Sequence, residues 1–160
     1  MKQTINDSES KYLQRAIELA YSAREHGNHP FGALLTDGNG NILLEAENTV
    51  VTEKDCTAHA ETNLMRAASK VYSEEELAKC TLYTSTEPCP MCTGAIFWGN
   101  VGKVVYALSE EGLYALTGET PYKLALPCRE LFARGTHPVE VIGPLNEEEA
   151  RQVHLGFWTG

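Results

Sequence analysis

The sequence predicts an α/β fold, a three-layer α/β/α sandwich around a mixed sheet of about five strands. Segments with apolar residues at helical spacing alternate with short β-rich runs along the chain. Two of these runs are joined through a helix, which makes neighbouring strands parallel. Two others flank a turn rich in Gly, Asp and Asn, as in an antiparallel hairpin. At 160 residues, the chain is expected to form one domain over residues 1–160.

The first half of the chain predicts two helices and one hairpin. Apolar residues at helical spacing predict a helix over 11–23. The runs 31–35 and 42–46 predict the two strands of the hairpin, because residues 37–40 read Asp-Gly-Asn-Gly between them. A second helix is predicted over 58–71, with Thr57 available as its N-cap.

The second half alternates strands with helices. Strands are predicted over 81–84, 103–108 and 139–142, and helices over 89–98, 127–133 and 146–157. Pro90 falls in the first turn of its helix, where a proline costs least. Asn146 and Glu149 have the spacing of a capping box that would open the last helix. The acidic run 74–76 is expected to be a solvated helix start.

Charge and hydropathy exclude several classes of protein. The chain has 13 Lys and Arg against 22 Asp and Glu, a net charge of −9. A protein surface that binds nucleic acid broadly usually carries a basic stripe, so this acidic balance argues against such a surface. The negative charge is compatible with a small neutral substrate. The chain contains no run of about 18 apolar residues, so no membrane-spanning helix is predicted. The first ten residues lack the apolar region of a secretory signal, so a cytoplasmic location is expected.

Five cysteines occur, an odd number that makes a disulfide framework improbable. We expect Cys56, Cys80 and Cys128 to be buried structural thiols. Cys89 and Cys92 are three residues apart at a predicted helix start, so both can reach one point. The helix dipole there favours thiolate, the form that binds zinc. A lone C-x-x-C also occurs in redox sites, so this motif alone leaves both interpretations open.

His59 and Glu61 lie at the start of another predicted helix. Because Cα–Cβ bonds tilt toward a helix N-terminus, His59 can point end-on at a metal and supply a third ligand. Three protein ligands leave one position open, which is typical of a catalytic zinc site. Glu61 is then free to move protons. Taken singly, a histidine or glutamate at a helix start is usually an ordinary surface or core residue.

The combination H-x-E…P-C-x-x-C is the signature of zinc deaminases. With it and the segments 30–33, 57–61 and 87–98, the chain resembles the cytidine deaminase-like superfamily over nearly its whole length. The branch holding bacterial guanine deaminase, fungal cytosine deaminase and bacterial tRNA adenosine deaminase is the most similar. The resemblance implies hydrolytic release of ammonia at Zn²⁺ and a hydrogen bond from Asn48 to the substrate base. It also implies the roles of the four site residues, with His59, Cys89 and Cys92 as zinc ligands and Glu61 as proton shuttle.

Guanine or guanosine is the first substrate expectation. Residues 30–33 and the pair Phe97-Trp98 are similar to guanine deaminase, and Phe31 or Trp98 could stack on a purine or pack in the core. Guanine deaminase has a carboxylate, thought to recognise the base, about 28 residues beyond the second cysteine. The sequence departs from that family here, because its Glu119 lies one position away from the expected place. Cytosine or cytidine is the alternative, since residues 91–96 are similar to fungal cytosine deaminase. A tRNA substrate is least expected, because the last helix starts with three glutamates.

Two further expectations concern partners and the end of the chain. Phe97 and Trp98 close a helix that the sheet cannot wholly cover, so a homodimer is expected, as in related small deaminases. Phe157 and Trp158 could cover the pocket as a lid or pack on the sheet.

Overall fold

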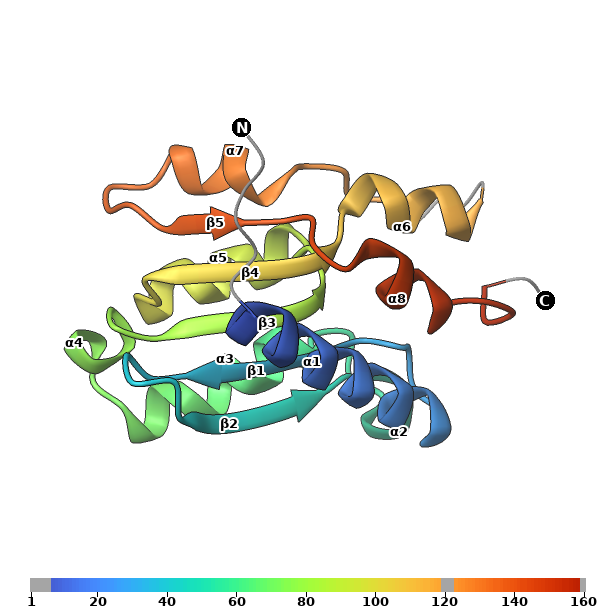
Figure 1. The fold of residues 1–160 in the computed structure, drawn as a ribbon, viewed down its shortest axis with the longest axis horizontal. Coiled ribbons are helices and arrows are strands. Elements are labelled where there is room, and N and C mark those ends of the chain that lie inside the picture. Colours follow the sequence, from blue (N-terminus) through green and yellow to red (C-terminus); the bar gives the residue numbers. More distant parts are fainter. Residues whose placement is uncertain (1–6, 119–122, 159–160) are drawn as a thin grey trace.

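A computed structural model describes residues 7–118 and 123–158, and its architecture is the predicted three-layer sandwich (Figure 1). The sheet runs in the order β2-β1-β3-β4-β5. Strand β1 is antiparallel to both β2 and β3, whereas β3, β4 and β5 are parallel, so the mixed five-stranded sheet is confirmed. The strands are β1 (Gly32–Thr36), β2 (Ile42–Glu47), β3 (Thr81–Thr86), β4 (Lys103–Leu108) and β5 (Glu140–Ile142).

Helices cover both faces of the sheet. They are α1 (Asp7–Glu25), α2 (Val50–Glu53), α3 (Ala60–Val71), α4 (Glu74–Leu77), α5 (Pro90–Gly99), α6 (Glu110–Thr117), α7 (Cys128–Ala133) and α8 (Glu147–Gln152). In Figure 1, α1 and α8 lie in front of the sheet and α3 and α5 behind it. Successive strand residues face opposite layers. Leu82 therefore packs in the core with α3 and α5, and Tyr83 packs in the core with α1.

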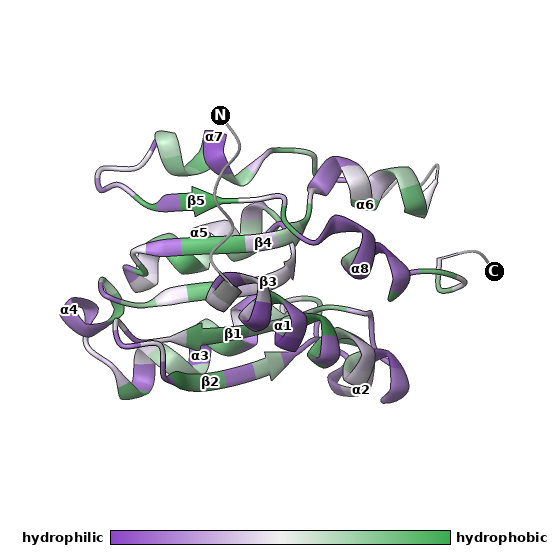
Figure 2. Cartoon of the chain, viewed as in Figure 1, coloured by the Kyte–Doolittle hydropathy of each residue, from purple (hydrophilic) through white to green (hydrophobic). Residues whose placement is uncertain are grey.

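Hydrophobic residues concentrate on the central strands, and α8 is largely hydrophilic (Figure 2). Both faces of β1 and β4 are buried under helices, which explains their continuous apolar runs. Within the described ranges, no helix is long and apolar enough to cross a membrane.

Two helix ends differ from the prediction because distant contacts decide them. Helix α1 already includes Asp7, the first described residue and four positions ahead of the predicted start, and Lys103 Nζ contacts a Glu9 carboxylate oxygen of this turn at 2.7 Å. Helix α8 ends at Gln152, not near Phe157. The Arg24 guanidinium donates to the carbonyls of Val153 and Leu155 at 2.7 and 2.8 Å, and these hydrogen bonds fix the turn that follows the helix.

One predicted N-cap is wrong, and the other residue takes the cap position without capping through its side chain. His59, not Thr57, is the N-cap of α3, and the Thr57 hydroxyl instead donates to Asp55 at 2.7 Å. Asn146 has a φ of +53°, and its amide donates to Ser10 Oγ at 3.0 Å, so it forms no capping box. In both cases a side chain that suits a cap has a better partner outside the helix.

Helices α2 and α6 were not predicted, and β3 extends two residues beyond its predicted end. The acidic run does open a helix, α4, whose N-cap Ser73 Oγ accepts from Glu76 N at 3.1 Å. All five cysteines are free. Cys80 and Cys128 are buried as predicted, but Cys56 is exposed, because it lies in the turn between α2 and α3.

Gly32 allows α1 to pack directly on β1. A Cβ at this position would lie 2.4 Å from the Ala16 carbonyl oxygen and 2.7 Å from the Ala20 nitrogen. These atoms are helix backbone, so they cannot move without displacing α1. Phe31 directly precedes this contact, and the packing therefore also sets the edge of the sheet where the site forms.

We predict that Gly32→Ala destabilises the protein by at least about 2 kcal/mol, because overpacking forces the backbone of α1 away from the sheet. Gly94→Ala is the control, since no atom lies within 4 Å of a Cβ there and alanine favours a helix by up to about 1 kcal/mol. Urea denaturation of both variants measures the difference. Equal stability of the two variants would contradict the close packing of α1.

Candidate metal centre

Two helix N-termini meet at the edge where β3 and β4 end. His59 is the N-cap of α3 and Cys89 is the N-cap of α5, with Pro90 in the first turn as predicted. The His59 Nδ1 atom lies 3.6 Å from Cys89 Sγ and 3.5 Å from Cys92 Sγ. The three ligand atoms all lie within 4.8 Å of one another. The structure therefore brings together the three residues predicted as ligands.

The spacing of these atoms fits zinc. Tetrahedral zinc with ordinary Zn–S and Zn–N bonds holds a sulfur and a nitrogen about 3.6 Å apart. A hydrogen bond from Cys92 and the nearby His59 lower the pKa of Cys89 to about 4. The pKa of Cys92 is raised by its hydrogen bond with Cys89 and by burial. One thiolate and one thiol sharing a proton form a donor set that zinc binding converts to two thiolates.

Glu61 lies beside the ligands without joining them. It is 5% exposed, and its Oε1 accepts from Thr84 Oγ1 at 2.8 Å. Burial and the nearby charge of Cys89 raise the pKa of Glu61. A buried carboxyl with a raised pKa is suited to taking up and releasing a proton.

Asn48 lies in the turn between β2 and α2 and is 1% exposed. Its backbone N–H donates to the Phe31 carbonyl at 3.1 Å, and its Oδ1 accepts from Val50 N at 3.0 Å. Within the described residues, its side-chain nitrogen has no hydrogen-bond partner. The turn thus holds the amide oxygen in place and leaves the amide N–H group available.

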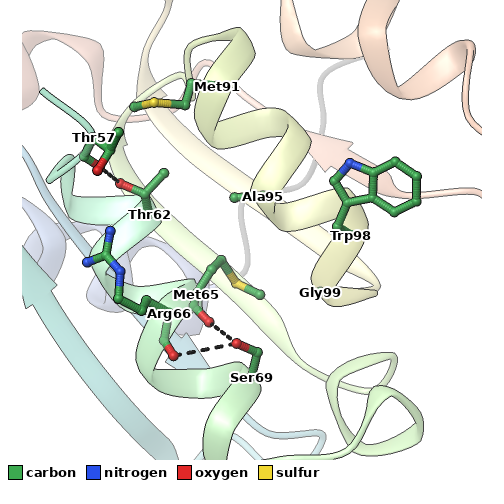
Figure 3. Close-up of a pocket in the computed structure, with 9 residues that line it drawn as sticks. All are labelled: Thr57, Thr62, Met65, Arg66, Ser69, Met91, Ala95, Trp98 and Gly99. Carbon is green, nitrogen blue, oxygen red and sulfur yellow. Dashed lines mark hydrogen bonds between the residues drawn. The ribbon is translucent and has the colours of Figure 1, made fainter.

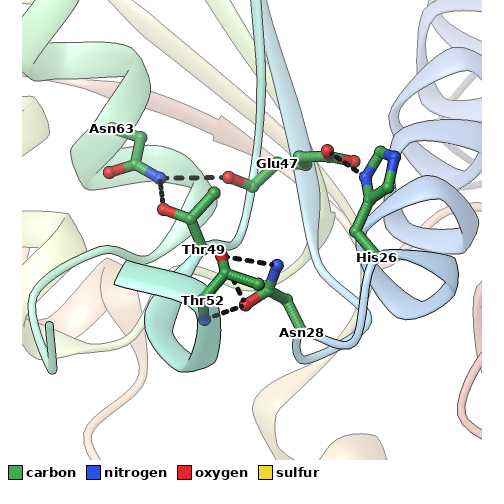
Figure 4. A network of polar contacts seen from close by, with 6 residues as sticks. All are labelled: His26, Asn28, Glu47, Thr49, Thr52 and Asn63. Atoms are coloured by element: carbon green, nitrogen blue, oxygen red, sulfur yellow. Dashed lines mark hydrogen bonds and ion pairs between the residues drawn. The ribbon is translucent and has the colours of Figure 1, made fainter. Parts of the chain in front are cut away.

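Two asparagines that sequence reasoning missed hold this turn (Figure 4). Asn28 Oδ1 accepts from the backbone N–H groups of Val51 and Thr52, both at 3.0 Å. Asn63 Nδ2 donates to the Glu47 carbonyl and to Thr49 Oγ1, both at 3.0 Å. These contacts join α2 and α3 across the turn. No local spacing signals them, because the partners lie up to 24 residues apart.

Phe31 lies at the start of β1 and contacts the end of the chain. Its ring centroid lies 5.4 Å from that of His154 and 6.2 Å from that of Trp158. Burial lowers the pKa of His154 to about 4, so its ring is neutral near pH 7. Its Nδ1 accepts from Trp158 Nε1 at 3.0 Å. The final turns therefore pack on Phe31.

His29 is a residue of this edge that the sequence did not single out. Burial and the charge of His59 lower the pKa of His29. Its ring centroid lies 5.9 Å from Phe157 and 5.6 Å from Trp158. Phe157 and Trp158 thus pack against His29, and the lid role stays a prediction.

The structure does not bring Trp98 to the ligands. Trp98 is nine residues beyond Cys89 along α5, about 13 Å along the helix axis. It is 80% exposed and lines a groove between α3 and α5 with Met65 and Met91 (Figure 3). Glu119, the other residue considered for reading a purine, lies outside the described residues.

Comparison with known proteins agrees with this geometry. The family described as the cytidine and deoxycytidylate deaminase zinc-binding region matches residues 6–108. The chain belongs to this deaminase family. It is therefore a hydrolase acting on C–N bonds, with zinc as its cofactor.

Relatives of this deaminase differ in substrate. A probable cytosine deaminase of Schizosaccharomyces pombe is 43% identical over 98% of this chain and 96% of its own length. Guanine deaminase of Bacillus subtilis is 46% identical, over 60% of this chain and 62% of its own length. A structure from studies of A-to-I editing by tRNA:A34 deaminases has a TM-score of 0.73 at 27% identity, covering 90% of this chain and 99% of that one.

We predict about one zinc per chain in the wild-type protein. Cys89→Ala and Cys92→Ala should each lose most of it, since two remaining ligands hold zinc weakly. Cys80→Ala is the matched control, because it removes a buried thiol away from the ligands. Elemental analysis after dialysis measures the zinc. Full occupancy in both ligand variants would refute the assignment.

Proposed function

We propose that this deaminase acts on a free nucleobase or nucleoside, with Glu61 as its proton shuttle. The observation that supports this most is the buried Glu61 carboxyl, held by Thr84 beside the three ligands. Zinc, when bound, supplies Lewis-acid activation of water. Glu61 would take up the proton released there and pass it to the ring nitrogen, then take the proton of the hydroxyl added to the ring carbon and pass it to the amino group, which leaves as ammonia.

Asn48 is proposed to orient the base. Its side-chain amide can present a donor and an acceptor, and Val50 N takes one of the two acceptor positions of its oxygen, whereas its N–H group has no partner among the described residues. The free N–H group would therefore donate to an acceptor on the base edge. Phe31 is proposed as an apolar wall, held by His154 and Trp158.

We place cytosine or cytidine first among substrates, supported by the probable cytosine deaminase that matches 98% of this chain. Guanine or guanosine, the first expectation from sequence, becomes the second candidate. One of its two supporting aromatics, Trp98, lies on an exposed groove away from the ligands. The guanine deaminase of Bacillus subtilis still supports it over 97 residues. The charge of −9 favours a free base over tRNA.

We predict that Glu61→Ala retains zinc but loses about 10²–10⁴-fold in kcat, because proton transfer contributes this much. Glu76→Ala, which removes an exposed carboxyl on α4, should leave kcat unchanged. Ammonia release and zinc content are measured together. Activity of Glu61→Ala within about threefold of wild type would refute the shuttle role.

The substrate prediction is tested by comparing kcat/KM for cytosine, cytidine, guanine and guanosine at two salt concentrations. We expect a pyrimidine to be preferred and salt to have little effect, since few counterions are displaced. A preference for guanine or guanosine above about tenfold, equal to about 1.4 kcal/mol, would reverse the order of candidates. Salt-sensitive activity on a tRNA anticodon stem, with none on free bases, would overturn the proposal.

We also propose a homodimer formed through the groove between α3 and α5. Trp98 is 80% exposed there, Met91 and Ala95 line the same groove, and exposed apolar surface of this kind commonly marks an interface (Figure 3).

Light scattering at micromolar concentration should then give twice the chain mass of 17.6 kDa. Trp98→Glu should shift the mass toward the monomer, because it places a charge in the apolar contact. Leu124→Glu is the control, as Leu124 is an exposed apolar residue outside this groove. A monomeric wild type would refute the dimer.

A further inference from the structure

The last residue of β3, Thr86, carries a buried hydroxyl that has no partner. Thr86 is 3% exposed. In the described part of the chain, three buried side-chain atoms lack a hydrogen bond: Glu47 Oε2, Thr86 Oγ1 and His154 Nε2. Buried polar groups in folded proteins nearly always have a partner, so each exception requires an explanation.

The neighbours of Thr86 on β3 show that this hydroxyl is unusual for its position. Residues 84, 85 and 86 all carry hydroxyls at the carboxyl end of the strand. Thr84 Oγ1 donates to Glu61, and Ser85 Oγ accepts from Gly32 N at 3.1 Å. Only the third hydroxyl of this run is left unpaired.

Strand geometry places the Thr86 side chain in the layer of the metal centre. Residues two apart on a strand face the same layer. Leu82 packs in the core with α3 and α5, and Thr84 reaches Glu61 from that face. Thr86 follows on the same face, one repeat nearer to the edge and three residues before Cys89. Alternation therefore puts the Thr86 side chain one repeat beyond Thr84, toward the edge of the sheet where α3 and α5 begin.

We infer that Thr86 determines substrate specificity by a hydrogen bond from its hydroxyl to the bound base. This inference rests on the proposed function, because it requires an aminated ring at the metal centre. A hydroxyl can donate to a ring nitrogen or carbonyl oxygen and can accept from a ring N–H. The base then satisfies the hydroxyl that the protein leaves unpaired.

This arrangement has a consequence for stability that a packing role would not have. The unpaired hydroxyl is unfavourable in the free protein, so its replacement by a methyl group of the same shape should not destabilise the fold. The same replacement removes one hydrogen bond from the complex. Thr86→Val should therefore lower substrate affinity while keeping or raising the melting temperature.

The experiment compares zinc-loaded wild type, Thr86→Val, Thr86→Ser and Thr36→Val on the four free bases and nucleosides. Thr36 is a matched control, because its buried hydroxyl lies at the opposite end of the sheet and contacts the Thr81 carbonyl. Thr86→Val should lose at least about fivefold in kcat/KM, mainly through KM, with no fall in melting temperature. Thr86→Ser should stay within about threefold of wild type. Thr36→Val should leave kcat/KM unchanged.

The outcomes separate this inference from the proposed function. If wild type deaminates a base and Thr86→Val stays within about twofold on every base, the role of Thr86 is refuted and the function stands. If wild type acts only on a tRNA anticodon stem, the free-base proposal fails, and the same variants on that stem decide the role of Thr86. A loss in Thr86→Val that Thr86→Ser does not rescue would also overturn the inference. No activity on any of these substrates would overturn both proposals.

Discussion

The meeting of two helix N-termini at one edge of the sheet is the constraint on which the rest of the site depends. His59 and Cys89 are N-caps of helices that begin 30 residues apart. Their ligand atoms and that of Cys92 nevertheless all lie within 4.8 Å of one another. Both helix dipoles favour negative charge at this point, so the thiolate form of the cysteine ligands is stabilised there. Because β3 and β4 are parallel, the segments that follow them, which lead into α5 and α6, start at the same edge of the sheet.

The antiparallel strand β1 brings a second group of residues to this edge. Because β1 runs against β3, its start lies beside the end of β3, and Gly32 N donates to Ser85 Oγ. Phe31 therefore lies near the metal centre although it precedes its strand. The same reversal places the Asn48 turn opposite Phe31, through the hydrogen bond from Asn48 N to the Phe31 carbonyl. A wholly parallel sheet would separate these groups.

The site thus has a shared chemical part and a part that can vary. The ligands and Glu61 are held by helix starts and a strand hydroxyl, all buried or half-buried. The groups proposed to contact the base come from loop and strand ends: Asn48, Phe31 and Thr86. On this proposal, substitution at these ends would change which ring fits without disturbing the ligands, which is consistent with relatives named for cytosine, guanine and tRNA substrates.

The sequence by itself determined the fold class and the identity of the metal-centre residues, because strand and helix periods and the motifs H-x-E and P-C-x-x-C are local patterns. A three-residue interval and a proline in the first turn locate Cys89 and Cys92 at a helix start, and strand and helix periods locate the layers. The ends of α1 and α8, the exposure of Trp98 and the position of His29 were decided only by the tertiary structure. The helix ends depend on partners far along the chain, Lys103 for Glu9 and Arg24 for the carbonyls of Val153 and Leu155. Whether a hydroxyl such as that of Thr86 has a partner is likewise set by its three-dimensional neighbours, and no local pattern contains that information.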